Sequence, residues 1–501
     1  MTVTIEPGLE ALKRCVADNG PEVTLYPLYT YVSAEETTPH AAYLKLARLD
    51  QEDHVPSFLL ESAKTMDAMA RFSYMGVGPR RILRTKAGAG DPLTLLATEL
   101  ARLRPARNTP QLPGLSGGAV GYVSYDCVRY FEPRTARELA DPLELPEAAL
   151  MLFDTVVAYD HVFQRFQVVH NMQLEAGNDL EAAYEDATRV IRDVVDRLTA
   201  SGPVPQPPQP PIRRGQEFRS NVGQEGYEGY VQRLKEHIYA GDIIQAVPSQ
   251  RVARPTSLHP FNIYRQLRTV NPSPYMFYLD YGDFQVVGAS PELLCKVDEE
   301  RQVVTHPIAG TIRRGATQQE DDALAAELRS SVKDRAEHVM LVDLARNDIN
   351  RVCDPLTTRV DKLMTVQRFS HVQHLVSEVT GTLRADKDRF DAFRSVFPAG
   401  TVSGAPKVRA MELIGELERE RRGVYAGAVG HWSYDGVSMD TCIALRTMVY
   451  KEGVAYLQAG GGIVHDSDPY DEYVETMNKM LANHNTILQA EELWAEKVGS
   501  E

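Results

Sequence analysis

Two stretches of the chain carry apolar residues at helical spacing, and a proline-rich segment separates them. Between residues 178 and 198 one face of a helix would collect Leu180, Tyr184, Ala187, Val190, Ile191, Val194 and Leu198. The same spacing recurs at Tyr227, Tyr230, Leu234 and Ile238, and Gly241 follows as a stop. We therefore predict an amphipathic helix on each side of the proline-rich segment.

The separating segment reads GPVPQPPQPPI, residues 202–212. Proline fixes φ and lacks a backbone N–H, so this run cannot continue a helix or a central strand and favours an extended linker. We therefore divide the chain into an N-terminal region, residues 1–201, a linker, residues 202–215, and a C-terminal region, residues 216–490. No internal repeat at a fixed period is present.

The C-terminal region mixes both kinds of pattern. One long helical pattern runs from Asp321 to Ala345, and β-branched or aromatic runs indicate strands at 275–281, 284–289, 424–432, 442–450 and 454–459. The strand runs come in neighbouring groups instead of alternating one by one with helices. This order favours an α+β fold, with largely antiparallel sheets packed with helices, over a doubly wound parallel sheet.

Composition and charge narrow the class of protein. The 501 residues are 43% hydrophobic and 25% charged, which is typical of a globular chain with a large core. The 54 Lys and Arg against 69 Asp and Glu give a net charge of −15, which argues against a nucleic-acid-binding or polybasic membrane surface. An anionic ligand would need a local cationic pocket.

No apolar run is long enough for a membrane-spanning helix, and the start of the sequence lacks the pattern of a secretory signal. We therefore expect a cytoplasmic protein. The cysteines are odd in number, far apart and without a C-x-x-C pair, which predicts buried free thiols instead of disulfides or a zinc ribbon: Cys15, Cys127, Cys295, Cys353 and Cys442.

Two predicted helices each carry acidic residues three positions apart, which places two carboxylates on one helix face. One has Asp334 and Glu337, and the other has Glu472 and Glu475. Each pattern alone is more often a solvated helix face. The functional alternative is that both helices direct carboxylates at one Mg²⁺, because this ion prefers oxygen ligands and one or two carboxylates.

The second acidic helix has a clear predicted start, with Asp468 as its N-cap and Pro469 as its first residue. Glu475 and Lys479 are four residues apart, which also fits an exposed ion pair worth about 0.2–0.5 kcal/mol. The acidic run HDSDPYDE lacks the central glycine and the twelfth-position glutamate of an EF-hand. A calcium loop is therefore excluded.

Two glycine-rich segments are candidates for binding loops. GTVSGAPK, residues 400–407, does not have the spacing of a phosphate-binding loop, and Ala-Pro separates its second glycine from Lys407. Residues 460–462 are three glycines after a strand pattern. They fit a plain turn, and they would also let backbone N–H groups approach a carboxylate.

Arg446 lies within the strand pattern of residues 442–450. Alternation there predicts that its side chain shares a half-apolar face with Ala444 and Met448. A guanidinium in such a place needs an anion. A bidentate contact with a substrate carboxylate and a structural salt bridge explain it equally well.

His371 and His374 have the spacing of helical metal ligands, but their surroundings are rich in β-branched residues and are followed by Gly381. We therefore predict a strand. Residues three apart on a strand point to opposite faces, so these histidines are not expected to bind one metal together.

Taken together, several segments resemble one family in the same order along the chain, from about Leu59 to Lys479: GDIIQAVPSQR, NPSPYMF, GASPELL, HPIAGT, DRAEHVMLVDLARND, HLVSEV, GTVSGAPKVRAMELI, YAGAVG, LQAGGGIV and DEYVETMNK. The set resembles the large subunits of anthranilate synthases, among the chorismate-utilising enzymes. The resemblance implies a chorismate-binding fold, dependence on Mg²⁺, and conversion of chorismate and ammonia to anthranilate and pyruvate. That reaction opens tryptophan biosynthesis.

Two positions separate the chemistries of this superfamily. Relatives that add water to chorismate have a lysine base where this chain has Gln245, and an amide cannot deprotonate water near neutral pH. Aminodeoxychorismate synthases typically carry a nucleophilic lysine where this chain has Ala309, which offers no amine. Free ammonia as the nucleophile fits both substitutions.

The resemblance also implies individual roles. Glu292 would protonate the departing C4 hydroxyl, and His374 would assist the loss of pyruvate with aromatisation. The implied catalytic set is Glu292, His374, Gln245 and Thr401. The residues implied to hold the carboxylates and the enolpyruvyl group of the substrate are Gly310, Thr311, Tyr425, Arg446, Gly461, Gly462 and Lys479.

For the implied Mg²⁺ site, the resemblance makes Glu337 and Glu475 direct ligands. Asp334 and Glu472 match positions that order the metal-bound waters. The family commonly has Glu where this chain has Asp334, so the reach of this carboxylate is one methylene shorter.

The N-terminal region contains LLESA, residues 59–63, which resembles the tryptophan feedback motif of the family. By itself this run fits a plain strand and turn, but with NPSPYM, residues 271–276, it implies an inhibitor pocket and a regulatory role for the N-terminal region. The residues implied are Leu60, Glu61, Ser62, Asn271, Pro274, Tyr275 and Met276.

Nothing in the chain resembles a glutamine amidotransferase, since no cysteine nucleophile elbow with a downstream histidine is present. The resemblance therefore implies that a separate glutaminase subunit delivers ammonia. Two alternatives are kept. One is the large subunit of an aminodeoxychorismate synthase, which Ala309 disfavours, and the other is a non-catalytic tryptophan-sensing subunit, which would have no need of the acidic residues, Arg446 and Lys479.

Overall fold

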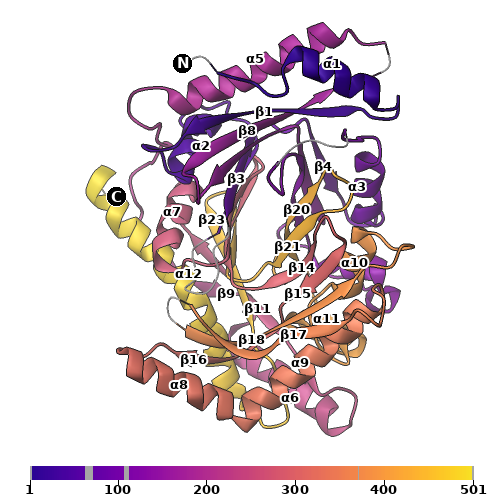
Figure 1. Cartoon of the computed structure of the whole chain (residues 1–501). Coiled ribbons are helices and arrows are strands. Elements are labelled where there is room, and N and C mark those ends of the chain that lie inside the picture. The colour runs from indigo at the N-terminus through magenta and orange to yellow at the C-terminus, as the bar shows by residue number, and fades with distance from the viewer. Residues whose placement is uncertain (1–2, 63–70, 107–111, 176, 370–371, 499–501) are drawn as a thin grey trace.

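The computed structural model describes residues 3–62, 71–106, 112–175, 177–369 and 372–498. Over these ranges the chain forms two large sheets that pack face to face, with helices on their outer sides (Figure 1). The pairings between neighbouring strands of the two sheets are antiparallel, as the grouped strand patterns predicted.

The larger sheet has eleven strands among the described residues. In spatial order they are β1 (Leu25–Ser33), β8 (Arg165–Gln173), β7 (Thr155–Asp160), β3 (Phe72–Val77), β2 (Ser57–Glu61), β12 (Tyr275–Asp280), β13 (Phe284–Ser290), β22 (Thr447–Lys451), β23 (Val454–Gly460), β11 (Ser249–Pro255) and β9 (Arg219–Ser220).

The second sheet has ten strands within the same described ranges. Its order is β16 (Ile308–Arg313), β18 (Val372–Thr382), β15 (Gln302–Thr305), β14 (Leu293–Val297), β21 (Met439–Ile443), β20 (Ala428–Ser433), β5 (Gly118–Val123), β6 (Ala148–Phe153) and β4 (Arg81–Thr85), and β17 (Arg359–Arg368) also pairs with β18. A separate small pair joins β10 (Gln245–Ala246) to β19 (Gly404–Ala405).

The α-helices are α1 (Leu9–Asp18), α2 (Pro39–Ala47), α3 (Pro92–Leu100), α4 (Val128–Phe131), α5 (Leu180–Thr199), α6 (Gly223–Tyr239), α7 (Pro260–Val270), α8 (Gln318–Ser330), α9 (Val332–Asn350), α10 (Arg389–Val396), α11 (Lys407–Glu418) and α12 (Pro469–Val498). Three short 3₁₀ turns are also described: η1 (Tyr125–Cys127), η2 (Pro133–Thr135) and η3 (Gly400–Val402). None of the described helices is both long and apolar enough to cross a membrane.

The core between the sheets explains the unbroken apolar run of β12. Successive side chains of a strand point to opposite faces. Phe277 and Leu279 enter the core between the two sheets, while Met276 and Tyr278 enter the core under the outer helices. Both faces of this central strand are therefore buried, and no polar alternation is possible.

Helices cover the outer face of each sheet. On the larger sheet, the outer core takes residues from α2, α5, α7 and α12, and on the second sheet it takes residues from α3, α9 and α10. Figure 1 shows α5 across β1 and β8, and α12 along the side of the molecule. The architecture is thus an α+β sandwich with four layers.

The proline-rich linker does not separate two independent bodies. β2 of the N-terminal region pairs with β12 of the C-terminal region, and β5 pairs with β20. Both sheets, and the core between them, therefore combine strands from residues 1–201 and 216–490. The division is one of sequence, because neither set of strands can bury its faces without the other.

The linker itself is extended and held by side chains. Gln209 accepts hydrogen bonds from the N–H of His259 and from the side chain of Asn262, both at 2.9 Å. The Arg213 N–H donates to the Ser257 hydroxyl at 3.0 Å, and Ile212 is fully buried. The extended conformation predicted from the prolines is confirmed, and the segment packs beside α7.

The structure confirms several local predictions and corrects two. α5, α6 and the start of α12 lie where the patterns placed them, and the Asp468 carboxylate accepts from the N–H groups of Tyr470 and Asp471. The single helix expected from Asp321 to Ala345 is wrong. Ser331 interrupts it, because its side chain caps the new helix α9 by accepting from the Asp334 N–H.

The second correction concerns residues 442–450, which were expected to form one strand. They form the end of β21 in one sheet and the start of β22 in the other, and Arg446 lies between them with φ +49°. The alternation that placed Arg446 on a face with Ala444 and Met448 therefore does not hold. All five cysteines are free, and four are buried, with Cys15 partly exposed.

Candidate active site

The chain passes between the two sheets at two crossovers that lie side by side. The first crossover, residues 290–293, joins β13 to β14, and the second crossover, residues 443–447, joins β21 to β22. The Ser290 hydroxyl donates to the Ile443 carbonyl at 2.6 Å, and the Ile443 N–H donates to the Glu292 carbonyl at 3.0 Å. Glu292 and Arg446 are thereby brought together from distant parts of the sequence.

Glu292 is almost fully buried, and its carboxyl group has a single side-chain hydrogen bond, from the Thr401 hydroxyl at 3.1 Å. Burial raises the pKa of Glu292 to about 8, although Thr401 and the positive charge of Arg446 oppose the shift. The group therefore carries a proton at neutral pH. A buried carboxylic acid of this kind can act as a general acid.

A cavity of about 20 Å³ beside Glu292 shows why burial dominates. Most of its wall is apolar, with Leu341, Leu344 and Val396 among the lining residues. Asp348 also lines it, but this carboxylate is paired with Lys407 at 2.6 Å. The low polarity around Glu292 disfavours its charged form.

Arg446 has the left-handed backbone conformation where the strand breaks, which is uncommon for a residue with a side chain. Burial lowers the pKa of Arg446, and the nearby Glu292 opposes this shift. Within the described residues its guanidinium has no hydrogen bond or ion pair. The salt-bridge alternative is therefore not seen there, and the geometry favours an external anion.

His374 lies on β18 opposite Thr311 of β16, and the predicted strand is confirmed. Its Nδ1 lies 2.9 Å from the Gly310 carbonyl, which can only accept, so Nδ1 carries the hydrogen. Nε2 is buried and has no partner among the residues that the structure describes, and burial lowers the pKa of His374 to about 4. The ring is thus neutral with a free acceptor nitrogen, while His371 lies outside the described residues.

Gly310 shapes the backbone opposite His374. It has φ +67° at an irregularity in the β16–β18 pairing. A Cβ atom there would lie 3.0 Å from Oδ1 of Asp334. Glycine is therefore needed both for the conformation and for the close approach of α9.

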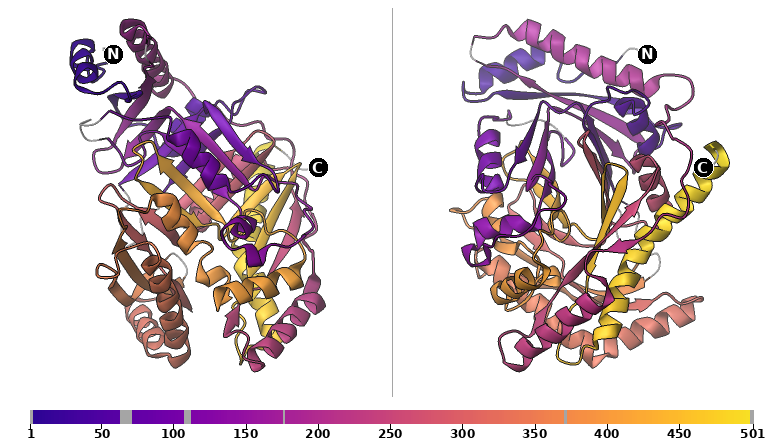
Figure 2. Two further views of the ribbon diagram at one scale, coloured as in Figure 1. Left: turned by 90° about the vertical axis from the view of Figure 1, so that its right-hand side faces the viewer. Right: turned by 180° about the vertical axis from the view of Figure 1, so that it is seen from behind.

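The acidic residues come from α9 and α12. In the left view of Figure 2, α8 and α9 lie on one side of the lower part of the molecule, and α6 and α12 lie on the other. Burial raises the pKa of Glu337, and the charges of Asp334 and Glu475 add to the rise. Burial raises the pKa of Glu472 as well, with a further contribution from Glu475. The negative charges of the two helices therefore act on one another.

This set could hold Mg²⁺. Within the described ranges, Glu472 Oε2 is buried without a partner, and the side-chain hydrogen bond that Glu337 accepts comes from the Gln245 amide, at 3.1 Å. Among the described residues no three Asp, Glu, His or Cys side chains are close enough to hold a metal alone. An ion bound here would therefore need waters or a substrate oxygen, which is the coordination that Mg²⁺ prefers.

Residues 460–462 bring α12 close to the small β10–β19 pair. A Cβ on Gly461 would lie 2.8 Å from Glu472 Oε2, and a Cβ on Gly462 would lie 2.3 Å from the Gln245 amide nitrogen. The Gly461 N–H donates to the Tyr227 hydroxyl at 3.2 Å. The absence of a Cβ at these two glycines lets the ends of the Glu472 and Gln245 side chains approach the backbone closely.

Lys479 and Tyr425 border the same glycine segment. The Lys479 ammonium donates to the Gly460 carbonyl at 3.0 Å and pairs with Glu475 at 2.7 Å, so the predicted ion pair is present. The side chains of Lys479 and Glu475 in this ion pair are each about half exposed. Tyr425 is buried just before β20, and burial raises its pKa to about 12. Its hydroxyl therefore stays protonated and can donate.

The structure brings the two segments of the implied inhibitor site together, because Glu61 and Met276 are direct partners in the β2–β12 pairing. Their side chains face α7, where Glu61 accepts from Tyr264 at 2.6 Å and pairs with Arg268 at 2.8 Å. Tyr275 instead donates to Asp440 of the other sheet at 3.1 Å.

The rest of the implied inhibitor set lies on both faces of β2 and β12 and at their ends. Leu60 packs in the core between the sheets, and Ser62 and Pro274 follow and precede the strands. Asn271 ends α7 with its side-chain nitrogen buried and without a partner. Ala63 lies outside the described residues.

Sequence analysis missed Arg422 and Glu418. They lie in ELERERR, residues 416–422, a charged run of the kind that is usually exposed, and yet Arg422 is 2% exposed. Its guanidinium packs between the rings of Tyr125 and Tyr425, at 4.4 and 5.6 Å from their centres. The spacing of four between Glu418 and Arg422 was the available signal, but it does not report burial.

Comparison with known proteins agrees with this geometry. The sequence pattern of the chorismate binding enzyme family matches residues 55–483. "Anthranilate synthase component 1" of Saccharomyces cerevisiae is 66% identical, covering 100% of this chain and 99% of that protein. "Probable anthranilate synthase component 1" of Schizosaccharomyces pombe is 56% identical, covering 95% of each. The crystal structure of anthranilate synthase component I from Streptococcus pneumoniae superposes with a TM-score of 0.74 at 36% identity, covering 90% of this chain and 99% of that one.

Proposed function

The chain belongs to the anthranilate synthase component 1 family of chorismate-binding enzymes, and from this premise we propose how its residues convert chorismate and ammonia to anthranilate and pyruvate. One observation carries the proposal. A buried carboxylic acid, an unpaired guanidinium and a neutral histidine with a free nitrogen occur together in Glu292, Arg446 and His374. These are an acid, an anion site and a base.

In the first step, ammonia attacks C2 of the chorismate ring and the C4 hydroxyl leaves. Glu292 gives its proton to that hydroxyl, which departs as water, so no hydroxide is released into a buried site. Arg446 and Lys479 supply the positive charge that holds the carboxylates of the substrate. The two double bonds of the ring shift as the C2–N bond forms and the C4–O bond breaks, and the nitrogen gives its extra proton to the solvent. The ring then carries an amine at C2.

In the second step, the enolpyruvyl group leaves as the enolate of pyruvate, which takes a proton on its methylene carbon from the solvent, and the ring becomes aromatic. The free Nε2 of His374 accepts the proton from C2, while the bond between C3 and the enolpyruvyl oxygen breaks. The Gly310 carbonyl fixes the ring through Nδ1–H and stabilises the cationic imidazolium that forms. The low pKa of His374 keeps the ring unprotonated before the step.

Mg²⁺ is proposed to bind at the acidic residues of α9 and α12. When bound, it would neutralise a carboxylate of the substrate and fix its position. Glu337 and Glu475 would be its protein ligands, and Asp334 and Glu472 would hold its waters. Support comes from the carboxylates' raising of one another's pKa, which Lys479 opposes, and from the Glu472 oxygen that has no partner among the described residues.

Tryptophan is proposed to inhibit the enzyme by binding near Glu61, Ser62, Asn271 and Met276. The unpartnered Asn271 amide is a free donor at this place, and Glu61 offers negative charge near the end of β2. Inhibition requires that the bound state lowers the affinity or the turnover for chorismate at the distant site. A separate glutaminase subunit is proposed to deliver ammonia, and the complex is proposed to work in the cytoplasm.

The aminodeoxychorismate alternative would need an amine at position 309. Ala309 lies on β16, paired with Leu375, and is 8% exposed, so no nucleophile is available there. The two readings differ in product. Anthranilate has lost pyruvate, whereas aminodeoxychorismate retains its enolpyruvyl group.

A product assay tests the proposal. The purified chain with chorismate, Mg²⁺ and ammonium should form fluorescent anthranilate, and glutamine alone should not support it. EDTA should abolish turnover and excess Mg²⁺ should restore it, because the candidate ligands are all oxygens. Formation of an aminated product that keeps its enolpyruvyl group would favour the alternative, and full activity in EDTA would remove the metal role of Glu337 and Glu475.

A further inference from the structure

Arg422 makes an unusually complete set of hydrogen bonds for a buried arginine. Its Nε and Nη2 donate to both carboxylate oxygens of Glu418, at 2.9 and 2.6 Å. Nη1 donates to the Val402 carbonyl at 2.9 Å, and Nη2 also donates to the Val247 carbonyl at 2.6 Å. Four contacts thus use the planar fork, which a lysine could not reproduce.

The two carbonyls belong to segments of the candidate active site. Val402 follows Thr401, whose hydroxyl donates to Glu292. Val247 follows the β10 strand, whose Gln245 side chain donates to Glu337. The Val247 N–H also donates to the Ser403 carbonyl at 3.0 Å, so Arg422 and one backbone bond tie the same two segments together.

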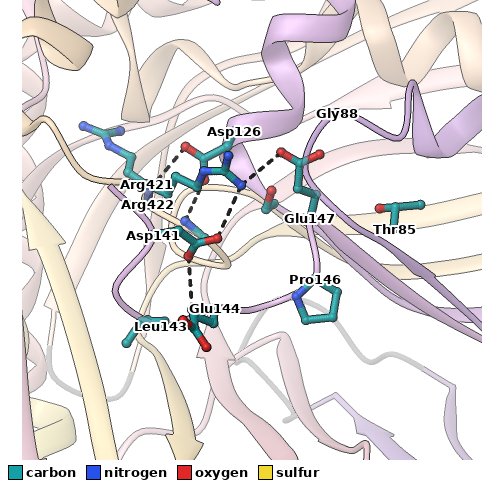
Figure 3. Close-up of polar contacts among 12 residues, drawn as sticks. Thr85, Gly88, Asp126, Asp141, Leu143, Glu144, Pro146, Glu147, Arg421 and Arg422 are labelled. Carbon is teal, nitrogen blue, oxygen red and sulfur yellow. Dashed lines mark hydrogen bonds and ion pairs between the residues drawn. The ribbon is translucent and has the colours of Figure 1, made fainter. Parts of the chain in front are cut away.

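The loop that carries Arg422 is held from the N-terminal region. The Asp126 carboxylate accepts from the N–H of Gly423 at 2.8 Å and from that of Arg422 at 3.4 Å. The neighbouring Arg421 reaches Asp141 and Glu147 at 3.4 and 3.5 Å. Figure 3 shows these acidic side chains around the two arginines. Arg422 is therefore fixed at its backbone and at its guanidinium.

We propose that Arg422 is a positioning residue for the proposed reaction, which holds Thr401 against Glu292 and Gln245 against Glu337 by clamping the carbonyls of Val402 and Val247. Glu418 anchors the clamp, because it also accepts from the N–H and the hydroxyl of Ser249 at 2.7 and 2.9 Å. The inference rests on the proposed role of Glu292 as the acid.

The consequence is chemical as well as structural. The Thr401 hydroxyl lowers the pKa of Glu292 against the effect of burial. If the clamp loosens, this hydrogen bond weakens and Glu292 becomes a weaker acid. The other charged groups that face Glu292 are Arg446 and the Asp348–Lys407 pair, and neither has a contact with Arg422 among the described residues. Their effect on Glu292 should not change.

The experiment compares Arg422→Lys with Thr401→Val and with a control, Arg254→Lys. Arg254 is a buried arginine on β11, 1% exposed and paired with Glu491 at 2.8 Å, and within the described residues its side-chain hydrogen bonds do not involve a residue of the proposed clamp. The dependence of kcat/KM for chorismate on pH is measured at constant free ammonia, together with the melting temperature. Arg422→Lys should lower kcat about 10- to 100-fold with little change in KM, as expected for misplaced catalytic groups.

The decisive readout is the alkaline side of the pH profile. Arg422→Lys and Thr401→Val should both move it upward, by about 0.5–1 pH unit, and the double variant should move it no further than Thr401→Val alone. Arg254→Lys should lower the melting temperature without moving the profile. An unmoved profile in Arg422→Lys, or additive shifts in the double variant, would overturn the proposal.

Misfolding of Arg422→Lys and inactivity of the wild-type chain have different consequences for the proposal. If Arg422→Lys does not fold, Glu418→Gln keeps the arginine and weakens its anchor, and it should shift the profile in the same direction, whereas an unshifted profile would count against the clamp. If the wild-type chain forms no anthranilate, the proposed function itself fails, which is a result distinct from failure of the clamp.

Discussion

Two buried glutamates of this protein have opposite surroundings. Glu61 accepts from Tyr264 and is paired with Arg268, so its charge is met by hydrogen bonds. Glu292 is buried to a similar degree, but among the described residues its carboxyl group has one side-chain donor, the Thr401 hydroxyl, beside a backbone hydrogen bond from Ile308. The difference shows that burial alone does not make a functional carboxyl group. What distinguishes Glu292 is that burial outweighs the groups that stabilise its charge, which are Thr401, the Ile308 backbone and Arg446.

The contrast extends to the neighbours. Among the other candidate site residues that the structure describes, buried polar atoms lack partners at Gln245 Oε1, His374 Nε2 and Glu472 Oε2. Such groups cost stability unless a ligand satisfies them. Near Glu61, the Asn271 amide nitrogen has no partner. The candidate active site therefore leaves several buried polar atoms for a ligand to satisfy, whereas the Glu61 region is hydrogen-bonded apart from one buried donor.

The largest effect is expected for Glu292→Gln. The amide keeps the shape of the side chain but cannot give up a proton as an acid, so anthranilate formation should fall about 10²–10⁴-fold. Chorismate should remain, and the stability at pH 7 should change little, because the native group is already neutral there. Anthranilate fluorescence measures the rate of product formation, and thermal unfolding measures the stability. Near-normal turnover would remove Glu292 as the acid.

A smaller effect of a different kind is expected for His374→Met. This variant should still carry out the first step but slow the second by about 10²-fold or more, the low end of general-base effects. An aminated compound that keeps its enolpyruvyl group should then accumulate. Chromatography of quenched reactions distinguishes it from chorismate. Wild-type release of anthranilate, or unreacted chorismate alone, would contradict this division of roles.

The pH dependence sharpens the contrast further. Because the folded-state pKa of Glu292 is raised to about 8, kcat/KM at constant free ammonia should fall about tenfold per pH unit above pH 8. The folded form binds an extra proton between the ordinary pKa of 4.5 and 8, so this group's contribution to stability is lost as the pH rises through that range. Glu292→Gln should abolish both trends. A profile that stays flat to pH 10 would contradict the assignment.

For the paired region, Glu61→Gln should act on stability. The amide has one accepting oxygen where the carboxylate has two, and it leaves a partly buried guanidinium without its counter-charge. A loss of about 1–3 kcal/mol in the free energy of unfolding is expected. Denaturant unfolding of Glu61→Gln and Glu292→Gln, measured side by side, tests this. Equal losses of stability in the two variants would contradict the contrast between Glu61 and Glu292.

The smallest effect on turnover is expected for Ser62→Phe and Met276→Ala. Both lie beside the Glu61 pair and outside the catalytic residues, so activity without tryptophan should stay within about twofold of wild type while inhibition is relieved. By linkage, tryptophan and chorismate should weaken each other's binding if inhibition raises the apparent KM. Titration of the initial rate with tryptophan measures this, and unchanged inhibition of Ser62→Phe would refute the assignment.

Local patterns predicted the local structure well. The apolar stripe of α5, the Asp468 cap of α12 and the strand at His374 need only neighbours in sequence, so the sequence sufficed. The helix break at Ser331 was missed because a serine inside a strong helical pattern can be either a cap or a surface residue. The strand break at Arg446 was missed because it depends on the chain leaving one sheet for the other.

The site depended on contacts that sequence patterns do not contain. Resemblance to a family placed Glu337 and Glu475 in one set, but not the Gln245 contact with Glu337 or the free Nε2 of His374. Arg422 was not identified from the sequence, because it lies in a run of charged residues and a single sequence does not show which of these charges is buried. Its partners Val402 and Val247 are backbone carbonyls, which have no identity in the sequence at all.

The interleaving of the two regions has a consequence for the making of the protein. During synthesis β5 cannot pair with β20 until about 310 more residues have been added, and β2 cannot pair with β12 until that later strand has been made. At roughly 5–20 residues per second, a ribosome needs about 15–60 s to supply β20. During that time the early strands have unpaired edges and exposed apolar faces, which are sites of aggregation. The nascent chain is therefore a natural client for chaperones, and cutting the gene at the linker would yield two fragments that fold only together.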